Sequence, residues 1–138
     1  VRAAIEEGIL PGGGVALLRS GKTLDSLKVE EFEAFGIKIL EEALKVPARQ
    51  IAENAGLNGE VVTNEVVLKD NFSYGYNALT NKYEDLLEAG IIDPFKVTKC
   101  ALQNAASVAI LLLTTDVIIA EDPVLAEKLL DKQMNQGY

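Results

Sequence analysis

Apolar residues recur at spacings of three and four positions along most of the chain, a pattern typical of amphipathic helices. The clearest example covers residues 30–45, with charged residues largely opposite the apolar ones. Because proline has no backbone N–H, we expect this helix to end at Pro47 or the next to begin there. A short helix over 48–55 should then stop at Gly56. The same spacing predicts helices over 1–7, 15–19, 79–89 and 94–113.

Two segments depart from a simple helical pattern. Residues 61–68 are rich in valine, which favours a strand, yet three of the valines have helical spacing and residues 58–60 could start a helix. Both interpretations stay open. Residues 71–78 are aromatic and rich in turn formers, which predicts a short hairpin or an extended loop.

The last third of the chain is the most apolar. The helix over 94–113 is apolar on most sides, so we expect it in the centre of a domain. Asp93 is placed to cap this helix and Pro94 to occupy its first position. Residues 115–120 predict a strand without a partner of similar length in the chain, so we expect pairing with another subunit or with sequence outside the chain. Residues 124–133 predict a short helix, followed by a loose tail.

Composition narrows the possible chemistry. The chain has 138 residues, enough for one domain, and its net charge of −8 argues against nucleic-acid binding. The absence of histidine excludes histidine-based acid–base chemistry and histidine metal sites. No apolar run reaches the roughly 18 residues that a membrane span needs.

The ends and the single cysteine carry two further expectations. Cys100 has no partner for an internal disulfide, which suits a reducing compartment, and we expect a buried, inert thiol. The chain begins at Val1 inside a predicted helix, without a start methionine or a cap. We therefore expect a fragment of a longer protein.

Two glycine-containing stretches are candidates for phosphate or sugar binding. Gly12, Gly13 and Gly14 precede a helix, so their loop offers free N–H groups and the positive end of the helix dipole. A tight interhelical turn is the simpler interpretation. Residues 20–23 look like the end of a phosphate-binding loop, but alanine stands where its first glycine should be. A solvated loop around Lys22 explains them better.

Three stretches, taken in order, resemble the group I chaperonins, the GroEL family. They are residues 1–8 running into 12–17, then 74–78, then 90–94 followed by Lys96 and Val97. The similarity continues through 101–106 and the two threonines at 114–115. Each motif is short, but their order and spacing together are specific. Residues 82–86, 100–105 and the C-terminal end look more like plastid-type chaperonins.

The resemblance implies a mainly α fold, the C-terminal half of an equatorial domain with a short hairpin and a C-terminal strand. Residues 1–7 would end an intermediate-domain helix, 8–120 would belong to the equatorial ATP-binding domain, and 121–138 would form a tail. Residues 61–68 would then be helical. Residues 115–120 would join a sheet shared with a neighbouring subunit.

The family binds ATP, and the resemblance assigns one part of that site to residues of this chain. Gly13, with Gly12 and Gly14, would lie against the ribose, and Asp93 would accept hydrogen bonds from the ribose hydroxyls. The chemistry is consistent, because a carboxylate takes two hydroxyl donors and glycine lets a ligand approach the backbone.

The same resemblance assigns the adenine side. Asn77 and Ala78, after Tyr76, would contact the base, and Ile91 would pack on its ring. Leu79 stands where the family often has alanine, and a bulkier residue there would narrow the pocket.

The rest of the family's machinery would lie outside this chain. ATP or ADP would be the ligand, while the Mg and K ions, the phosphate loop and the catalytic aspartates belong to absent parts. We therefore expect no catalytic residue or metal ligand here and no ATPase activity from the fragment alone. The implied partners are a homo- or hetero-oligomeric ring and, through the absent apical domain, a co-chaperonin and unfolded polypeptides.

Two alternatives accompany this interpretation. The chain could be a helical oligomerisation scaffold without a nucleotide role of its own. We expect a location in the plastid stroma or apicoplast, with the bacterial cytoplasm or mitochondrial matrix as the alternative.

Overall fold

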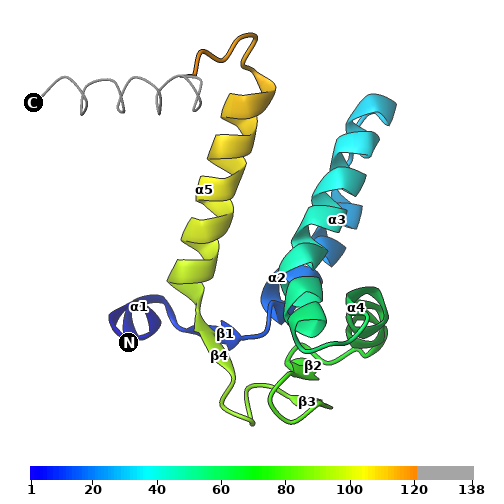
Figure 1. The fold of residues 1–138 in the computed structure, drawn as a ribbon, viewed down its shortest axis with the longest axis vertical. Helices are drawn as coiled ribbons and strands as arrows, with labels where there is room; N and C mark the ends of the chain where they lie inside the picture. The colour runs from blue at the N-terminus through cyan, green and yellow to red at the C-terminus, as the bar shows by residue number, and fades with distance from the viewer. Residues whose placement is uncertain (121–138) are drawn as a thin grey trace, which may run out of the picture. The chain divides into compact units, whose positions relative to one another are not determined.

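The computed structural model describes residues 1–120, so the predicted helix over 124–133 and the tail lie outside the described residues. The chain divides into two units, residues 1–102 and 103–138. The elements are α1 (Arg2–Glu7), β1 (Ile9–Pro11), α2 (Val15–Ser20), the 3₁₀ helix η1 (Gly21–Ser26), α3 (Glu31–Asn54), α4 (Gly59–Leu68), β2 (Tyr74–Asn77), β3 (Lys82–Asp85), β4 (Ile92–Pro94) and α5 (Phe95–Leu113) (Figure 1). The predicted mainly helical fold is confirmed.

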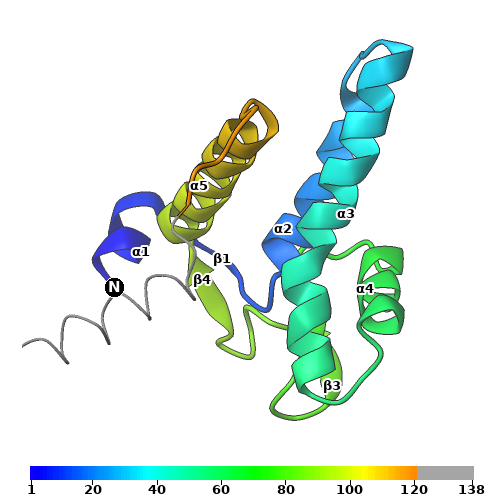
Figure 2. The same cartoon turned by 45° about the horizontal axis from the view of Figure 1, so that its top comes forward.

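The core of the first unit forms where α2 and α4 pack on α3 (Figure 2). Ala52 and Leu86 are completely buried. One cluster of buried residues surrounds Leu86 and a second surrounds Ala52. Both contain residues of the helices, and residues of the β2–β3 hairpin belong to them or pack against them. The buried members are Val15, Leu18, Ala48, Val66 and Leu86 in the first, and Ala52, Val62 and Tyr76 in the second.

Helix α3 runs unbroken through Pro47, so the predicted break there is wrong. A proline inside a helix costs about 3 kcal/mol, because it removes a hydrogen bond and crowds the preceding turn. Leu44, Ala48 and Ala52 are buried on both sides of Pro47, at a spacing of four. Burial of this stripe against neighbouring elements offsets the local cost. The predicted stop is confirmed, since the helix ends at Asn54 and Gly56 has a φ of +82°.

Residues 61–68 lie in helix α4, as the resemblance implied. The side chain of Asn58 accepts hydrogen bonds from the backbone N–H groups of Glu60 and Val61, at 3.0 and 3.2 Å. Asparagine at this position satisfies donors that the first helical turn leaves unpaired. Val62 and Val66, four residues apart, are buried on the face toward the core. Capping and burial together outweigh the preference of valine for strands.

A hairpin is present, but it spans residues 74–85 instead of the predicted 71–78. The predicted helix over 79–89 is wrong, because residues 82–85 form the second strand. Strands β2 and β3 pair antiparallel, with Tyr76 opposite Tyr83. The Asn77 side chain accepts from the N–H groups of Leu79 and Thr80, at 2.9 and 3.3 Å. Asn81 adopts a φ of +56°. These features form the turn that reverses the chain, a use of asparagine that helical spacing does not reveal.

Strands β1 and β4 form a short antiparallel ladder in which Leu10 pairs with Asp93. Pro94 ends β4, and helix α5 begins at Phe95, whose N–H donates to the Gly8 carbonyl at 3.1 Å. The predicted cap by Asp93 is not formed, because its backbone is held in the ladder. No hydrogen bond reaches its carboxylate from residues 1–120.

Three expectations for the C-terminal third are not met in the described part of the chain. Helix α5 has no buried residue, although its composition predicted a central helix. Cys100 is exposed instead of buried. Residues 115–120 form no strand; pairing with another subunit stays a prediction. None of the described helices is long and apolar enough to cross a membrane.

Substitutions at two glycines can show how closely the glycine loop packs on α3. An ideal Cβ on Gly14 would lie 2.6 Å from the Ala48 backbone nitrogen, and Gly14 has a φ of +74°. We expect Gly14→Ala to destabilise the complete protein by about 2 kcal/mol or more, because overpacking adds to backbone strain. Gly36, inside α3, has no atom within 4 Å of such a Cβ. Gly36→Ala is the matched control and should stabilise by up to about 1 kcal/mol.

The measurement is the midpoint of denaturant unfolding, together with hydrogen exchange of the Leu18 amide, which bonds to the Gly14 carbonyl. Equal effects of the two substitutions would contradict the close approach of the loop to α3.

Candidate functional site

The ladder of β1 and β4 brings the glycine loop beside Asp93. At the end of the ladder the Gly12 N–H donates to the Ile91 carbonyl at 2.9 Å. Gly13 and Gly14 follow with φ values of +64° and +74°, a region that favours glycine. The loop therefore turns sharply, approaches α3 closely and opens directly into α2.

A cavity of about 430 Å³, here called the glycine–aspartate cavity, lies at this loop. Its volume falls within the roughly 300–1,000 Å³ typical of small-molecule sites. The polar side chains in its wall are the Asp93 carboxylate and the Thr98 hydroxyl, and the remainder is apolar or glycine. Its lining is Gly13, Gly14, Ala16, Leu17, Pro47, Ile51, Asp93, Val97, Thr98 and Ala101.

Asp93 is the main polar group available to a ligand in this cavity. Its side chain is half-buried, and within residues 1–120 its oxygens accept no hydrogen bond. A carboxylate has about four acceptor positions and no donor when ionised. The arrangement suits a ligand that presents hydroxyl donors near the glycine loop.

The predicted adenine contacts do not line the glycine–aspartate cavity. Asn77 uses both ends of its side-chain amide within the hairpin, since its nitrogen donates to Glu84 at 2.6 Å and its oxygen accepts from the turn. The Tyr76 hydroxyl donates to Asn81 at 2.6 Å, and Ala78 is exposed. The Tyr76 carbonyl nevertheless comes near the loop, 3.7 Å from an ideal Cβ on Gly13.

Ile91 joins the glycine loop to the core. Its side chain packs on the cluster around Leu86, and a Cβ on Gly12 would lie 3.1 Å from its methyl group. The structure thus brings Gly13, Gly14 and Asp93 to one cavity, and places Gly12 and Ile91 in contact beside it.

Sequence analysis missed the apolar walls of the cavity. Pro47 and Ile51 come from α3, and Val97, Thr98 and Ala101 come from α5. Pro47 and Ile51 lie four positions apart, as do Val97 and Ala101, and this spacing marks a shared face on each helix. That spacing was a usable signal, but it did not show that the two faces meet at the same loop.

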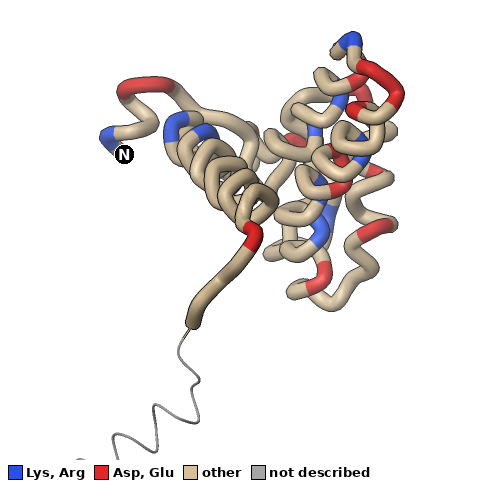
Figure 3. Tube along the Cα trace, turned by 90° about the horizontal axis from the view of Figure 1, so that it is seen from above, with Lys and Arg blue, Asp and Glu red and all other residues tan. Residues whose placement is uncertain are grey.

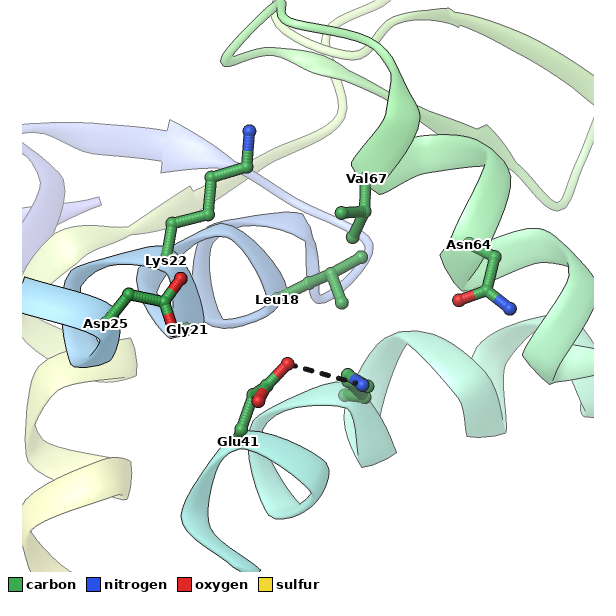
Figure 4. A pocket seen from close by; sticks show the side chains of 8 residues that line it. Leu18, Gly21, Lys22, Asp25, Glu41, Asn64 and Val67 are labelled. Atoms are coloured by element: carbon green, nitrogen blue, oxygen red, sulfur yellow. Dashed lines mark ion pairs between the residues drawn. The ribbon is translucent and has the colours of Figure 1, made fainter. Parts of the chain in front are cut away.

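A second, smaller cavity of about 260 Å³ lies among η1, α3 and α4 (Figure 4). Two of its charged residues form ion pairs, since Lys45 lies 3.5 Å from Glu41 and Lys22 lies 3.9 Å from Asp70. Lys22 lines this cavity and not the glycine–aspartate cavity. Its segment is the 3₁₀ helix η1 instead of the predicted loop. The lining residues are Leu18, Gly21, Lys22, Asp25, Glu41, Lys45, Asn64 and Val67.

Acidic residues are spread over several segments and alternate with Lys and Arg along α3 (Figure 3). Within residues 1–120 no three His, Cys, Asp or Glu side chains cluster closely enough to hold a metal ion.

Asp85 fixes the base of the hairpin. Its carboxylate accepts from the Ser73 hydroxyl and from the N–H groups of Leu87 and Glu88, at 3.0 and 3.1 Å for the two backbone groups. The hydrogen bond from Ser73 contributes most to lowering the pKa of Asp85 from its ordinary value of 3.8. The backbone hydrogen bonds act in the same direction.

The model of the TCP-1/cpn60 chaperonin family matches residues 1–123. The crystal structure of a group III chaperonin in the open state is similar, with a TM-score of 0.77 and 39% identity over 85% of this chain and 25% of that chain. An open-state monomer of a group II chaperonin from Methanococcoides burtonii is also similar, with a TM-score of 0.71 and 27% identity. The match covers 82% of this chain and 30% of that chain. The chain thus spans less than a third of either protein.

The Asp85 network predicts how the hairpin responds to acid. Because the folded pKa is lowered, the stabilisation is present above the unfolded value and is lost as pH falls through the folded value. Ser73→Ala should raise the pKa of Asp85 toward its ordinary value and shift the loss of hairpin protection to higher pH. Hydrogen exchange of residues 74–85, corrected for intrinsic rates, measures the shift. Asp25→Asn is the control, and an unchanged profile in Ser73→Ala would contradict the prediction.

Proposed function

This chain belongs to the TCP-1/cpn60 chaperonin family, and from that premise we propose that it supplies the ribose side of an ATP site in a chaperonin that assists protein folding. One observation carries the proposal. The pairing of β1 with β4 places Gly13 and Asp93, which are 80 positions apart in the sequence, on the wall of the same 430 Å³ cavity.

The chemistry of the cavity supports a nucleoside ligand. Two ribose hydroxyls can both donate to one carboxylate, and such charge-assisted hydrogen bonds are stronger than neutral ones. The absence of side chains at Gly13 and Gly14 lets a sugar ring approach the backbone. Apolar residues of α3 and α5 complete the wall beside these polar groups, and a mainly apolar wall with a few polar groups is typical of small-molecule sites.

We assign the adenine side to the hairpin and Ile91 as part of the same proposal. The support is proximity, since the Tyr76 carbonyl lies near Gly13 and Ile91 touches Gly12. The amide of Asn77 is engaged by Glu84, so the base would be contacted by main-chain groups unless that bond opens. Leu79 is 91% exposed, and its side chain is free to narrow the pocket beside the base.

The remaining steps of the ATP cycle belong, in this proposal, to other parts of the complete protein. These parts would supply the phosphate loop, the Mg and K ions and the catalytic aspartates, so that the full chain hydrolyses ATP. The complete protein would assemble into a ring and bind a co-chaperonin and unfolded polypeptides through an apical domain.

Group I membership, with a plastid-type origin and location, is also a proposal and rests on the motifs in residues 1–17, 74–78 and 90–97. The two similar solved structures are of groups III and II. Dependence of the complete protein on a separate co-chaperonin would support group I.

A helical scaffold without a nucleotide role is the second candidate. It is favoured by the apolar side chains on the first half of α3, where Phe32, Phe35 and Ile39 are 87%, 65% and 72% exposed. A surface of this kind is typical of protein–protein contact. The two functions are separable at Asp93.

Asp93→Asn keeps the size of the side chain and removes its charge. If Asp93 accepts from the ribose, the affinity of the complete protein for ADP should fall about ten- to hundred-fold, since each hydrogen bond to a charged group contributes roughly 1.5–3 kcal/mol. Isothermal titration calorimetry with ADP measures the change.

Asp25→Asn and Lys22→Ala, both in the smaller cavity, are the matched controls and should leave the affinity unchanged. Unchanged affinity in Asp93→Asn would favour the scaffold. A lower affinity for ADP in Lys22→Ala would support the phosphate-loop interpretation of residues 20–23.

Residues 1–138 alone should release no phosphate from ATP. Hydrolysis requires stabilisation of charge at the γ-phosphate and a positioned water, and we assign both to other parts of the protein. A steady-state phosphate-release assay checks this, with the complete protein as the positive control. Turnover by the short chain near that of the complete protein would refute the division of roles.

A further inference from the structure

Arg19 is a buried cation that the proposed site does not yet use. It lies on α2, one turn after the glycine loop, and is 9% exposed. Its guanidinium donates to three main-chain carbonyls, those of Val66 at 3.0 Å, Lys69 at 3.1 Å and Tyr74 at 3.2 Å. Burying a cation among neutral partners is costly. A methionine would fill the same space at lower cost, so the directional bonds need an explanation.

The three acceptors belong to two different elements. Val66 and Lys69 lie at the C-terminal end of α4, where carbonyls have no partner within the helix and the dipole is negative. Tyr74 is the first residue of β2. The rigid fork of the guanidinium thus holds the end of α4 and the start of β2 at a defined position relative to α2.

Strand β2 leads from this anchor to the proposed adenine contacts. Tyr76 and Asn77 follow Tyr74 by two and three residues, which is about 10 Å of strand at most. The strand also lies tightly against the start of α2, since an ideal Cβ on Gly75 would lie 2.6 Å from a methyl group of Val15. A small displacement of β2 therefore changes the distance between the glycine loop and the hairpin.

We propose that Arg19 is a positioning residue for the adenine half of the nucleotide site, coupling the glycine loop on α2 to the hairpin that carries Tyr76 and Asn77. The inference rests on the proposed function. It assigns base selectivity to Arg19 and ribose affinity to Asp93, which makes the two roles separable. Burial lowers the pKa of Arg19, and nearby Asp70 opposes this. A guanidinium is not deprotonated in proteins.

The test uses the complete protein with Arg19→Lys and Arg19→Met. Arg49→Lys is the matched control, because Arg49 pairs with Glu42 and Glu60 and does not bond to the hairpin. Dissociation constants are measured for ATP, GTP and ribose 5′-triphosphate. We expect Arg19→Lys to reduce the preference for ATP over GTP about ten-fold, since the loss of one hydrogen bond to the base changes affinity by up to about ten-fold. Affinity for ribose 5′-triphosphate should stay within about two-fold of the parent.

A second readout needs no nucleotide. Hydrogen exchange of residues 74–77 in the free protein should be faster in both Arg19 variants and unchanged in Arg49→Lys. If Arg19 had a purely structural role, its substitution would lower the affinity for all three ligands equally. That result would overturn the inference. The inference is also overturned if folded Arg19→Lys protein keeps the parent's preference for ATP over GTP, or if both Arg19 variants unfold.

The proposed function fails by a different result. If Asp93→Asn leaves the affinity for ADP unchanged while the Arg19 variants lose base preference, the ribose assignment is wrong and the role of Arg19 stands. If the parent protein binds no nucleotide, both are overturned.

Discussion

The short ladder between β1 and β4 is the constraint on which the rest of the site depends. It joins Leu10 to Asp93 and continues through the hydrogen bond from Gly12 to Ile91. The glycine loop begins at one end of this ladder, and α5 begins at the other. Without the pairing, the loop and the carboxylate would belong to unrelated parts of the chain. With it, they share one cavity whose wall has one acidic side chain.

The glycines matter because of what surrounds the ladder. Gly14 lies against the backbone of Ala48 with a positive φ, so this position accepts no side chain. The close approach lets α3 form part of the cavity wall through Pro47 and Ile51. Packing and ligand access thus make the same demand on one residue. The loop is therefore more than a simple turn, because it also forms part of the cavity wall.

Uncovered apolar surface is the second general feature of the molecule. Helix α5 has no buried residue, and the first half of α3 exposes two phenylalanines. The chain spans 25% of one similar chaperonin chain and 30% of another. Apolar helix faces of this extent are energetically costly in water, since each buried methylene contributes about 0.8 kcal/mol. Contact with further protein would remove that cost, whichever of the two candidate functions applies.

Features that depend on near neighbours follow from the sequence alone. These include the mainly helical fold and the stop of α3 at Gly56. The cap at Asn58 is equally local, although the valines of residues 61–68 left helix and strand both open. Each follows from a residue's own conformational range or from a side chain that bonds two or three positions away. The resemblance to chaperonins added Gly13 and Asp93 as a pair, which spacing alone did not connect.

Only the tertiary structure decided the features that depend on distant partners. Pro47 stays inside α3 because residues on both sides are buried by other elements. Residues 82–85 form a strand because β2 offers them a partner. The same reason applies to the cavity walls from α3 and α5 and to Arg19, whose acceptors lie 47 to 55 positions away. Local preference amounts to fractions of a kcal/mol for most residues and about 3 kcal/mol for proline, and burial and pairing over long distances exceed it.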